Sequence, residues 1–117
     1  MGADSFLTFL HNAEFDRSWT SLGFDDEELF RLQKEIASDP EAGKVISGTG
    51  GLRKIRFARS GSGKSGGVRV CYAYFPGMGI ILLACVFAKN AKANLTRQEK
   101  ARFAELIAGI QTRFSGA

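Results

Sequence analysis

Acidic residues are missing from the middle of this chain: the stretch from Ala42 to Gln98 contains neither aspartate nor glutamate. This absence excludes a carboxylate-ligated metal site within the stretch. The stretch instead contains ten lysines and arginines, so its formal charge is +10. Residues 1–41 hold ten of the twelve carboxylates and carry −7, whereas residues 99–117 contribute +1 to the net charge of +4. A cationic block without competing carboxylates indicates that the protein binds a polyanion.

Histidine and cysteine are also scarce, with one histidine and two cysteines in 117 residues. No spacing in the sequence supports a Ser–His–Asp hydrolase, and we expect His11 to be a surface or structural residue. Cys71 and Cys85 lie inside strand-like runs, where we interpret them as small buried hydrophobic residues. This cysteine usage fits a reduced, cytoplasmic protein.

Long apolar runs are missing as well. The longest, from Ile80 to Ala88, is far shorter than the roughly 20 residues that span a bilayer. The N-terminus also lacks the basic region and apolar run of a signal peptide, so we expect no membrane contact. An apolar fraction of 44% with ten phenylalanines predicts one folded domain over residues 1–117 with a substantial core.

Helical patterns flank the basic block on both sides. Asn12 can cap a helix in which the apolar residues from Phe15 to Leu22 fall at helical spacing. Residues 25–39 predict a second helix, with acids in its first turn and a proline after its end. Thr96 and Glu99 predict a capping box at the start of a C-terminal helix. The apolar stripe of that last helix consists of Phe103, Leu106, Ile107, Ile110 and Phe114.

Strand-like patterns fill the basic block. Residues Leu52–Arg59 alternate in the manner of a strand, and Val68–Phe75 and Ile80–Phe87 follow after short connections. The third run is apolar on both faces, which predicts a central strand covered by helices. Phe6–Leu10 is a candidate edge or opening strand. We therefore predict an α+β fold, in which a twisted antiparallel sheet of three to four strands is flanked by two N-terminal helices and one C-terminal helix.

Residues 58–65 nearly match the phosphate-loop pattern G-x-x-x-x-G-K-[ST], with Ala58 in place of the first glycine. A phosphate loop must lead into a helix whose N-terminus holds the phosphates. Here Gly66-Gly67 leads into the strand-like run that begins at Val68, and no aspartate follows a later apolar strand to hold magnesium. We therefore do not expect nucleotide hydrolysis.

The cations of the predicted strands form a candidate phosphate-binding set. Lys54 and Arg56 are two residues apart on one strand, so their side chains share a face at a spacing of about 6.5–7 Å. Arg69 enters the next strand and Lys89 ends the third. Single exposed cations often only keep a sheet face soluble, but the lack of acidic partners for the whole set favours phosphate binding.

Such a set can cleave RNA without a metal ion or a histidine. The 2′-hydroxyl attacks the adjacent phosphate, and arginine stabilises the charge that grows on the phosphate oxygens. A lysine crowded by other cations can act as the base. Because the nucleophile belongs to RNA alone, DNA could bind without reacting. The same charges would also serve simple binding, so both alternatives stay open.

Three sequence blocks carry a family likeness. They are GTGGLRKIRFAR at residues 48–59, GSGKSGGVRVCY at 61–72 and FAKNAKANLT at 87–96. In this order they resemble RelE/HigB-type toxins of bacterial toxin–antitoxin pairs, most closely the HigB-like branch, over roughly residues 45–98. The resemblance implies a RelE-like microbial RNase fold and a metal-independent, cofactor-free mRNA endonuclease that acts in the ribosomal A site. It also implies a cognate antitoxin, expected to be a helix-turn-helix protein.

By motif position, the resemblance implies catalytic roles for Lys54, Arg56, Arg69 and Lys89. Further RNA contacts are expected from neighbouring residues, namely Arg53, Arg59, Lys64, Asn90, Lys92 and Asn94.

The sequence departs from the family pattern at two points. The C-terminal catalytic tyrosine of the best-studied RelE toxins has no counterpart after Lys89, since Tyr72 and Tyr74 lie on an earlier strand. Asn90 stands where those toxins commonly have arginine. The alternatives are a non-catalytic RNA- or DNA-binding module that uses the same basic face, or a face built chiefly to bind an acidic antitoxin.

Overall fold

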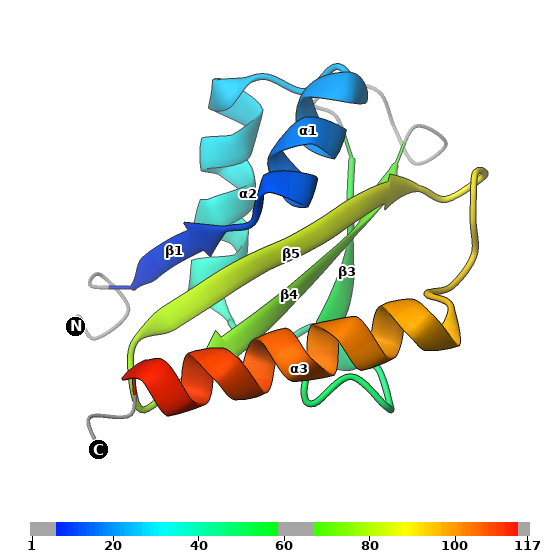
Figure 1. Cartoon of the computed structure of the whole chain (residues 1–117). Coiled ribbons are helices and arrows are strands. Elements are labelled where there is room, and N and C mark those ends of the chain that lie inside the picture. Colours follow the sequence, from blue (N-terminus) through cyan, green and yellow to red (C-terminus); the bar gives the residue numbers. More distant parts are fainter. Residues whose placement is uncertain (1–6, 59–66, 115–117) are drawn as a thin grey trace.

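The computed structural model describes residues 7–58 and 67–114, which form three helices and five strands (Figure 1). In chain order the elements are β1 (Thr8–His11), α1 (Ala13–Ser21), α2 (Asp26–Ser38), β2 (Lys44–Val45), β3 (Arg53–Phe57), β4 (Val68–Phe75), β5 (Ile80–Ala88) and α3 (Arg97–Phe114). The strands form one sheet in the order β1-β5-β4-β3-β2. Helices α1 and α2 cover one side of the sheet, and α3 crosses the other. The predicted α+β architecture is therefore confirmed.

The sheet has one more strand than the upper limit of the prediction, and one of its pairs is parallel. β1 runs parallel to β5, with Thr8 opposite Ile80, whereas the other pairs are antiparallel. β2 adds two residues beside β3. Helices α1 and α2 carry the chain from β1 at one edge of the sheet to β2 at the other. Because the β1–β5 pair joins distant segments, no local sequence pattern reveals its direction.

The N-terminal helices begin where the sequence places their caps. The side chain of Asn12 accepts a hydrogen bond of 2.8 Å from the N–H of Phe15. At the start of α2, Asp25 and Glu28 form a reciprocal capping box, with each side chain accepting the other's N–H at 2.9 and 3.1 Å. These contacts satisfy N–H groups that the first turn of a helix leaves without partners. Local sequence therefore determines both starts.

Two apolar cores pack on the two faces of the sheet. The first lies beneath α1 and α2 and includes Phe15, Leu32 and Tyr72. The second lies beneath α3 and includes Phe103 and Ile107. β5 contributes to both cores, which confirms its predicted place inside the sheet with helices on both sides.

α3 buries a narrower stripe than its sequence predicts. Phe103 and Ile107 are each 2% exposed, but Leu106 and Phe114 are 37% and 47% exposed. The buried face continues instead through the partly buried Ile110. None of the helices formed by residues 7–58 and 67–114 combines the length and the apolar character needed to cross a membrane.

Candidate nucleic-acid interface

β3 presents two cations to the face of the sheet that α3 crosses. Ile55 and Phe57 pack into the core beneath α1 and α2. Alternation along the strand therefore turns Lys54 and Arg56 to the opposite face, as their two-residue spacing predicts. α3 covers only part of this face, because the ends of β3 and β5 and the start of β4 extend beyond it (Figure 1). Arg56 is exposed and Lys54 is partly buried.

Strand pairing brings Arg69 to the same place. Arg56 lies opposite Arg69, and Arg69 lies opposite Phe87, so one row of side chains crosses three strands. In the next row, Lys54 lies opposite Cys71. Side chains in one row are direct neighbours, since paired strands are about 4.8 Å apart. We refer to Lys54, Arg56 and Arg69 as the basic cluster.

A narrow crevice lies between the basic cluster and the first turns of α3. Its lining includes Lys54, Phe87, Asn94 and Lys100. Its volume of about 30 Å³ is far below the roughly 300–1,000 Å³ of typical small-molecule pockets. This crevice is therefore too small to enclose a typical small-molecule ligand.

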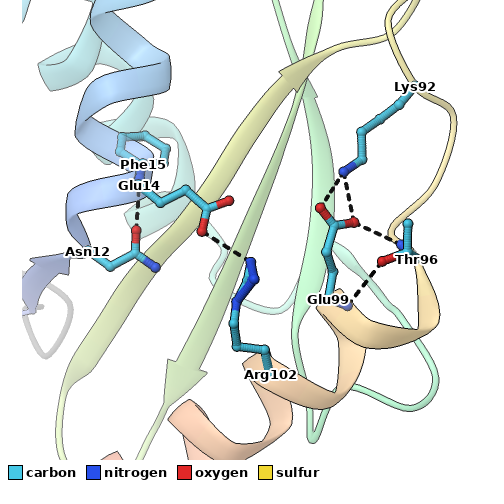
Figure 2. Close-up of polar contacts among 7 residues, drawn as sticks. All are labelled: Asn12, Glu14, Phe15, Lys92, Thr96, Glu99 and Arg102. Carbon is cyan, nitrogen blue, oxygen red and sulfur yellow. Dashed lines mark hydrogen bonds and ion pairs between the residues drawn. The ribbon is translucent and has the colours of Figure 1, made fainter.

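An ion pair anchors the connection between β5 and α3. The Nζ atom of Lys92 lies 2.7 and 2.6 Å from the two carboxylate oxygens of Glu99 (Figure 2). Glu99 also accepts the N–H of Thr96 at 2.8 Å and donates its own N–H to the Thr96 hydroxyl at 3.1 Å, which confirms the predicted capping box. The Lys92 ammonium lies 5.3 Å from the centre of the Phe87 ring. Lys92, a predicted RNA contact, is therefore already paired in the free protein.

Three other predicted residues of this connection remain at the surface. Lys89 and Asn90 are exposed and directly follow β5, at the end of the sheet that carries Arg56 and Arg69. Asn94 is exposed and lines the crevice beside Lys54. The structure thus brings Lys89, Asn90 and Asn94 toward the basic cluster.

The Lys92–Glu99 pair makes stability depend on pH. Burial raises the pKa of Glu99, but hydrogen bonds from Lys92 and Thr96 outweigh burial and hold this pKa below its ordinary value. A carboxylate with a lowered pKa stabilises the fold above the ordinary glutamate pKa of about 4.3, and this contribution is lost as the pH falls through the folded pKa.

We expect Glu99→Gln to lower the free energy of unfolding by about 1 kcal/mol at pH 7, because the ion pair is lost. The difference from the wild type should shrink as the pH falls below about 4. Urea unfolding at both pH values measures it, with Glu105→Gln at an exposed position of α3 as the matched control. If the stability difference between Glu99→Gln and the wild type were the same at pH 7 and below about pH 4, the charge of Glu99 would have no role.

Arg53 does not join the basic cluster. It lies opposite Tyr72, whose side chain belongs to the core beneath α1 and α2. Its guanidinium donates hydrogen bonds to the carbonyl oxygens of Glu41 at 2.9 Å and Gly43 at 2.8 Å, so it ties residues 41–43 to β3. The predicted contacts Arg59 and Lys64 lie outside the described residues.

Neither tyrosine reaches the basic cluster. Tyr72 is 1% exposed, and its hydroxyl donates to the carbonyl of Pro40 at 2.8 Å while accepting the N–H of Gly43 at 3.1 Å. Tyr74 packs against the same core. Burial raises the pKa of the Tyr72 hydroxyl, which stays protonated at neutral pH. β4 therefore offers no substitute for the tyrosine that the family pattern would place after Lys89.

Removal of the Tyr72 hydroxyl tests this structural role. We expect Tyr72→Phe to lower the free energy of unfolding by about 1–3 kcal/mol, because the buried N–H of Gly43 loses its acceptor. Tyr74→Phe is the matched control, since the Tyr74 hydroxyl has no hydrogen-bond partner among residues 7–58 and 67–114. Thermal unfolding measures both, and equal stability of the two variants would refute the assignment.

Histidine and cysteine supply no catalytic group at this face. His11 lies in β1, where Nδ1 is 3.0 Å from Asp16 and Nε2 is 3.2 Å from the amide nitrogen of Gln33, as expected for a structural residue.

Cys71 and Cys85 are free, buried and opposite each other, which confirms their predicted role as small buried residues. A hydrogen bond with Cys71 and burial raise the pKa of the Cys85 thiol. Across the described ranges, no cluster of three histidine, cysteine or acidic side chains could hold a metal ion.

Two lysines beside Lys54 were not identified as site residues by the sequence argument. Lys44 lies opposite Lys54, but β2 is too short for a strand pattern to reveal it. Lys100 lines the crevice from α3. It precedes Phe103 and Ile107 at helical spacing, so its inward stripe position is the signal that could have identified it.

Comparison with known proteins identifies the family and the fold of this chain. The family model for the RelE toxin of the RelE/RelB toxin–antitoxin system matches residues 8–115. A free-state structure of an arginine-to-alanine double variant of the E. coli toxin RelE is similar, with a TM-score of 0.52 and 19% identity. That match covers 74% of this chain and 86% of the E. coli chain and shows the fold alone. Likeness to the HigB-like branch stays a prediction. Because the family model covers nearly the whole sequence, the chain belongs to the RelE toxin family.

Proposed function

We propose that this toxin inhibits translation by cutting messenger RNA in the ribosomal A site. The observation that carries the proposal is the basic cluster: three cations from two adjacent strands share one face of the sheet, where Arg56 is exposed and Lys54 lies beside the start of α3. The crevice beside Lys54 has no carboxylate in its lining. Membership in the RelE toxin family supports the role as a toxin.

The proposed reaction uses the 2′-hydroxyl of the RNA as its nucleophile. That oxygen attacks the adjacent phosphorus and loses its proton, while the bond to the 5′-oxygen of the next nucleotide breaks and that oxygen gains a proton. The products are a 2′,3′-cyclic phosphate and a 5′-hydroxyl end. Arg56 and Arg69, neighbours in one row, stabilise the charge that develops on the phosphate oxygens.

Lys54 is the candidate for proton transfer. It lies one row from Arg56 along β3, about 6.5–7 Å away at the backbone, so it can reach a ribose next to a phosphate held by the arginines. The residues that line the crevice include no histidine, tyrosine or carboxylate. We propose a metal-independent step, because a cationic donor set repels a divalent cation and stabilises anionic charge directly.

The proposed partners follow from the same surface. RNA and the ribosome present phosphates that the +10 block can bind, and this interaction would take place in the cytoplasm. A cognate antitoxin, expected to be a helix-turn-helix protein, would neutralise the toxin. The adjacent reading frame is the direct place to look for it.

One observation favours a second candidate, a non-catalytic RNA- or DNA-binding module. Tyr72 and Tyr74 face away from the basic cluster, and Asn90 occupies the position where the resemblance would place arginine. Such a module would bind nucleic acid with strong salt dependence but would leave mRNA intact.

Mapping of mRNA 5′ ends in a translation extract distinguishes the two candidates. With the toxin present, we expect new 5′-hydroxyl ends within translated reading frames, and none when initiation is blocked. Salt-dependent retention of RNA without new ends would support the binding module. Ends that appear equally without ribosomes would contradict ribosome dependence.

A further inference from the structure

We propose that Lys44 and Lys100, which flank Lys54, form a second phosphate subsite beside the one assigned to Arg56 and Arg69. Its ligand is a neighbouring phosphodiester of the same single-stranded RNA. The inference deepens the proposed function and rests on it for the identity of the polyanion. Neither Lys44 nor Lys100 is among the residues that the family resemblance implies.

The turn between β2 and β3 supports the half of α3 that carries Lys100. The turn is closed by hydrogen bonds from the N–H of Ile46 to the carbonyl of Leu52 at 2.8 Å and from the Thr49 hydroxyl to the carbonyl of Ile46 at 2.6 Å. Thr49 is fully buried. Gly50, at φ +76°, lies so close to Ala104 of α3 that a Cβ there would be 3.4 Å from the Ala104 Cα. Helix and turn are therefore in direct contact.

This contact places the Lys100 side chain over the crevice. Its Cδ would be 3.7 Å from a Cβ at Gly48, so its aliphatic stem runs along the turn. Lys100 and Lys54 line the same crevice, and Asn94 adds an amide at its rim. Lys44 lies opposite Lys54 and, by strand pairing, on the same face. Lys44 and Lys100 are therefore both neighbours of Lys54, one through strand pairing and the other across the crevice.

The lysines around the crevice lack acidic partners in the part of the chain that the structure describes, which indicates a role in binding an anion. Within the described ranges, no carboxylate oxygen lies within 4.0 Å of the Lys44, Lys54 or Lys100 ammonium, whereas Lys92 nearby is paired with Glu99. Like charges on neighbouring strand positions destabilise a fold. Lys100 also occupies the inward stripe of α3, where an apolar residue would pack better. The repulsion between these lysines opposes folding, and no carboxylate of the described residues offsets it. This is the arrangement expected of a site where a bound ligand supplies the negative charge.

Binding of a non-cleavable RNA tests the subsite. The probe is a short single strand with 2′-O-methyl riboses, which binds through its phosphates but cannot undergo 2′-hydroxyl attack. We expect Lys100→Met to weaken binding by about five- to tenfold at moderate salt and to lower the slope of log affinity against log salt by about 0.7. The melting temperature should stay equal or rise, because a repulsive charge is removed. Lys100→Arg should retain the slope.

Lys34→Met on the exposed face of α2 is the matched control and should change neither slope nor affinity. Lys100→Met binding with wild-type affinity and slope would overturn the inference, as would a lower melting temperature with an unchanged slope. The probe separates this result from the proposed function. A changed slope in a protein that cuts no mRNA would keep the subsite and reject the nuclease. An unchanged slope in a protein that cuts mRNA would reject the subsite and keep the nuclease.

Discussion

Alanine at Lys54, Arg56 or Arg69 is expected to lower the rate of mRNA cleavage by roughly 10²- to 10³-fold and to relieve growth arrest on induction. Each side chain belongs to the basic cluster, and the two arginines are direct neighbours across β3 and β4. When one cation is removed, the negative charge that develops on the phosphate oxygens during cleavage is less well stabilised. These side chains are exposed or partly buried, so the melting temperature should change little. Growth curves and the rate of appearance of 5′ ends measure the effect.

Two further variants test the position of the charge and the geometry of its hydrogen-bond donors. Arg113→Ala removes an arginine at the far end of α3, away from the cluster, and should leave cleavage unchanged. Arg69→Lys keeps the charge but loses the planar pair of donors that grips a phosphate, so its activity should be intermediate. Arrest that survives all three alanine substitutions would show that the basic cluster is not the site.

Trp19→Ala is expected to have the largest effect on stability, with a loss of about 3–5 kcal/mol in the free energy of unfolding. Trp19 is 4% exposed, and its ring lies 5.5 Å from that of Phe15, 4.3 Å from that of Phe24 and 5.7 Å from that of Phe57. Its indole N–H donates to the carbonyl of Asp25, the capping residue of α2, at 3.1 Å. One side chain therefore joins α1, the start of α2 and β3.

Urea unfolding followed by far-ultraviolet circular dichroism measures this loss, because the variant removes the only tryptophan and with it the usual fluorescence signal. Phe30→Ala is the control, since Phe30 is 61% exposed and should change stability by no more than about 0.5 kcal/mol. A Trp19→Ala loss below about 1 kcal/mol would mean that the aromatic cluster does not organise this core. Loss of arrest in this variant would follow from unfolding and would say nothing about the basic cluster.

The sequence by itself determined the features that depend on neighbours along the chain. Helix starts at Asn12, Asp25 and Thr96 follow from side chains that reach their own first turns. The shared face of Lys54 and Arg56 follows from the two-residue period of a strand. The acid-free block is a matter of composition, and it indicated a polyanion before any fold was known.

Tertiary structure decided which cations lie together, because that depends on contacts between distant segments. Arg53 is next to Lys54 in sequence, yet it faces the other way and binds backbone carbonyls. Lys92 finds Glu99 only when the connection after β5 folds back onto α3. Lys100 lies beyond the acid-free block, but the packing of α3 on the β2–β3 turn brings it beside Lys54. The charge pattern alone does not specify strand register, the face that a side chain occupies or helix packing. Composition therefore predicted the class of ligand, a polyanion, whereas the fold determined which cations lie side by side.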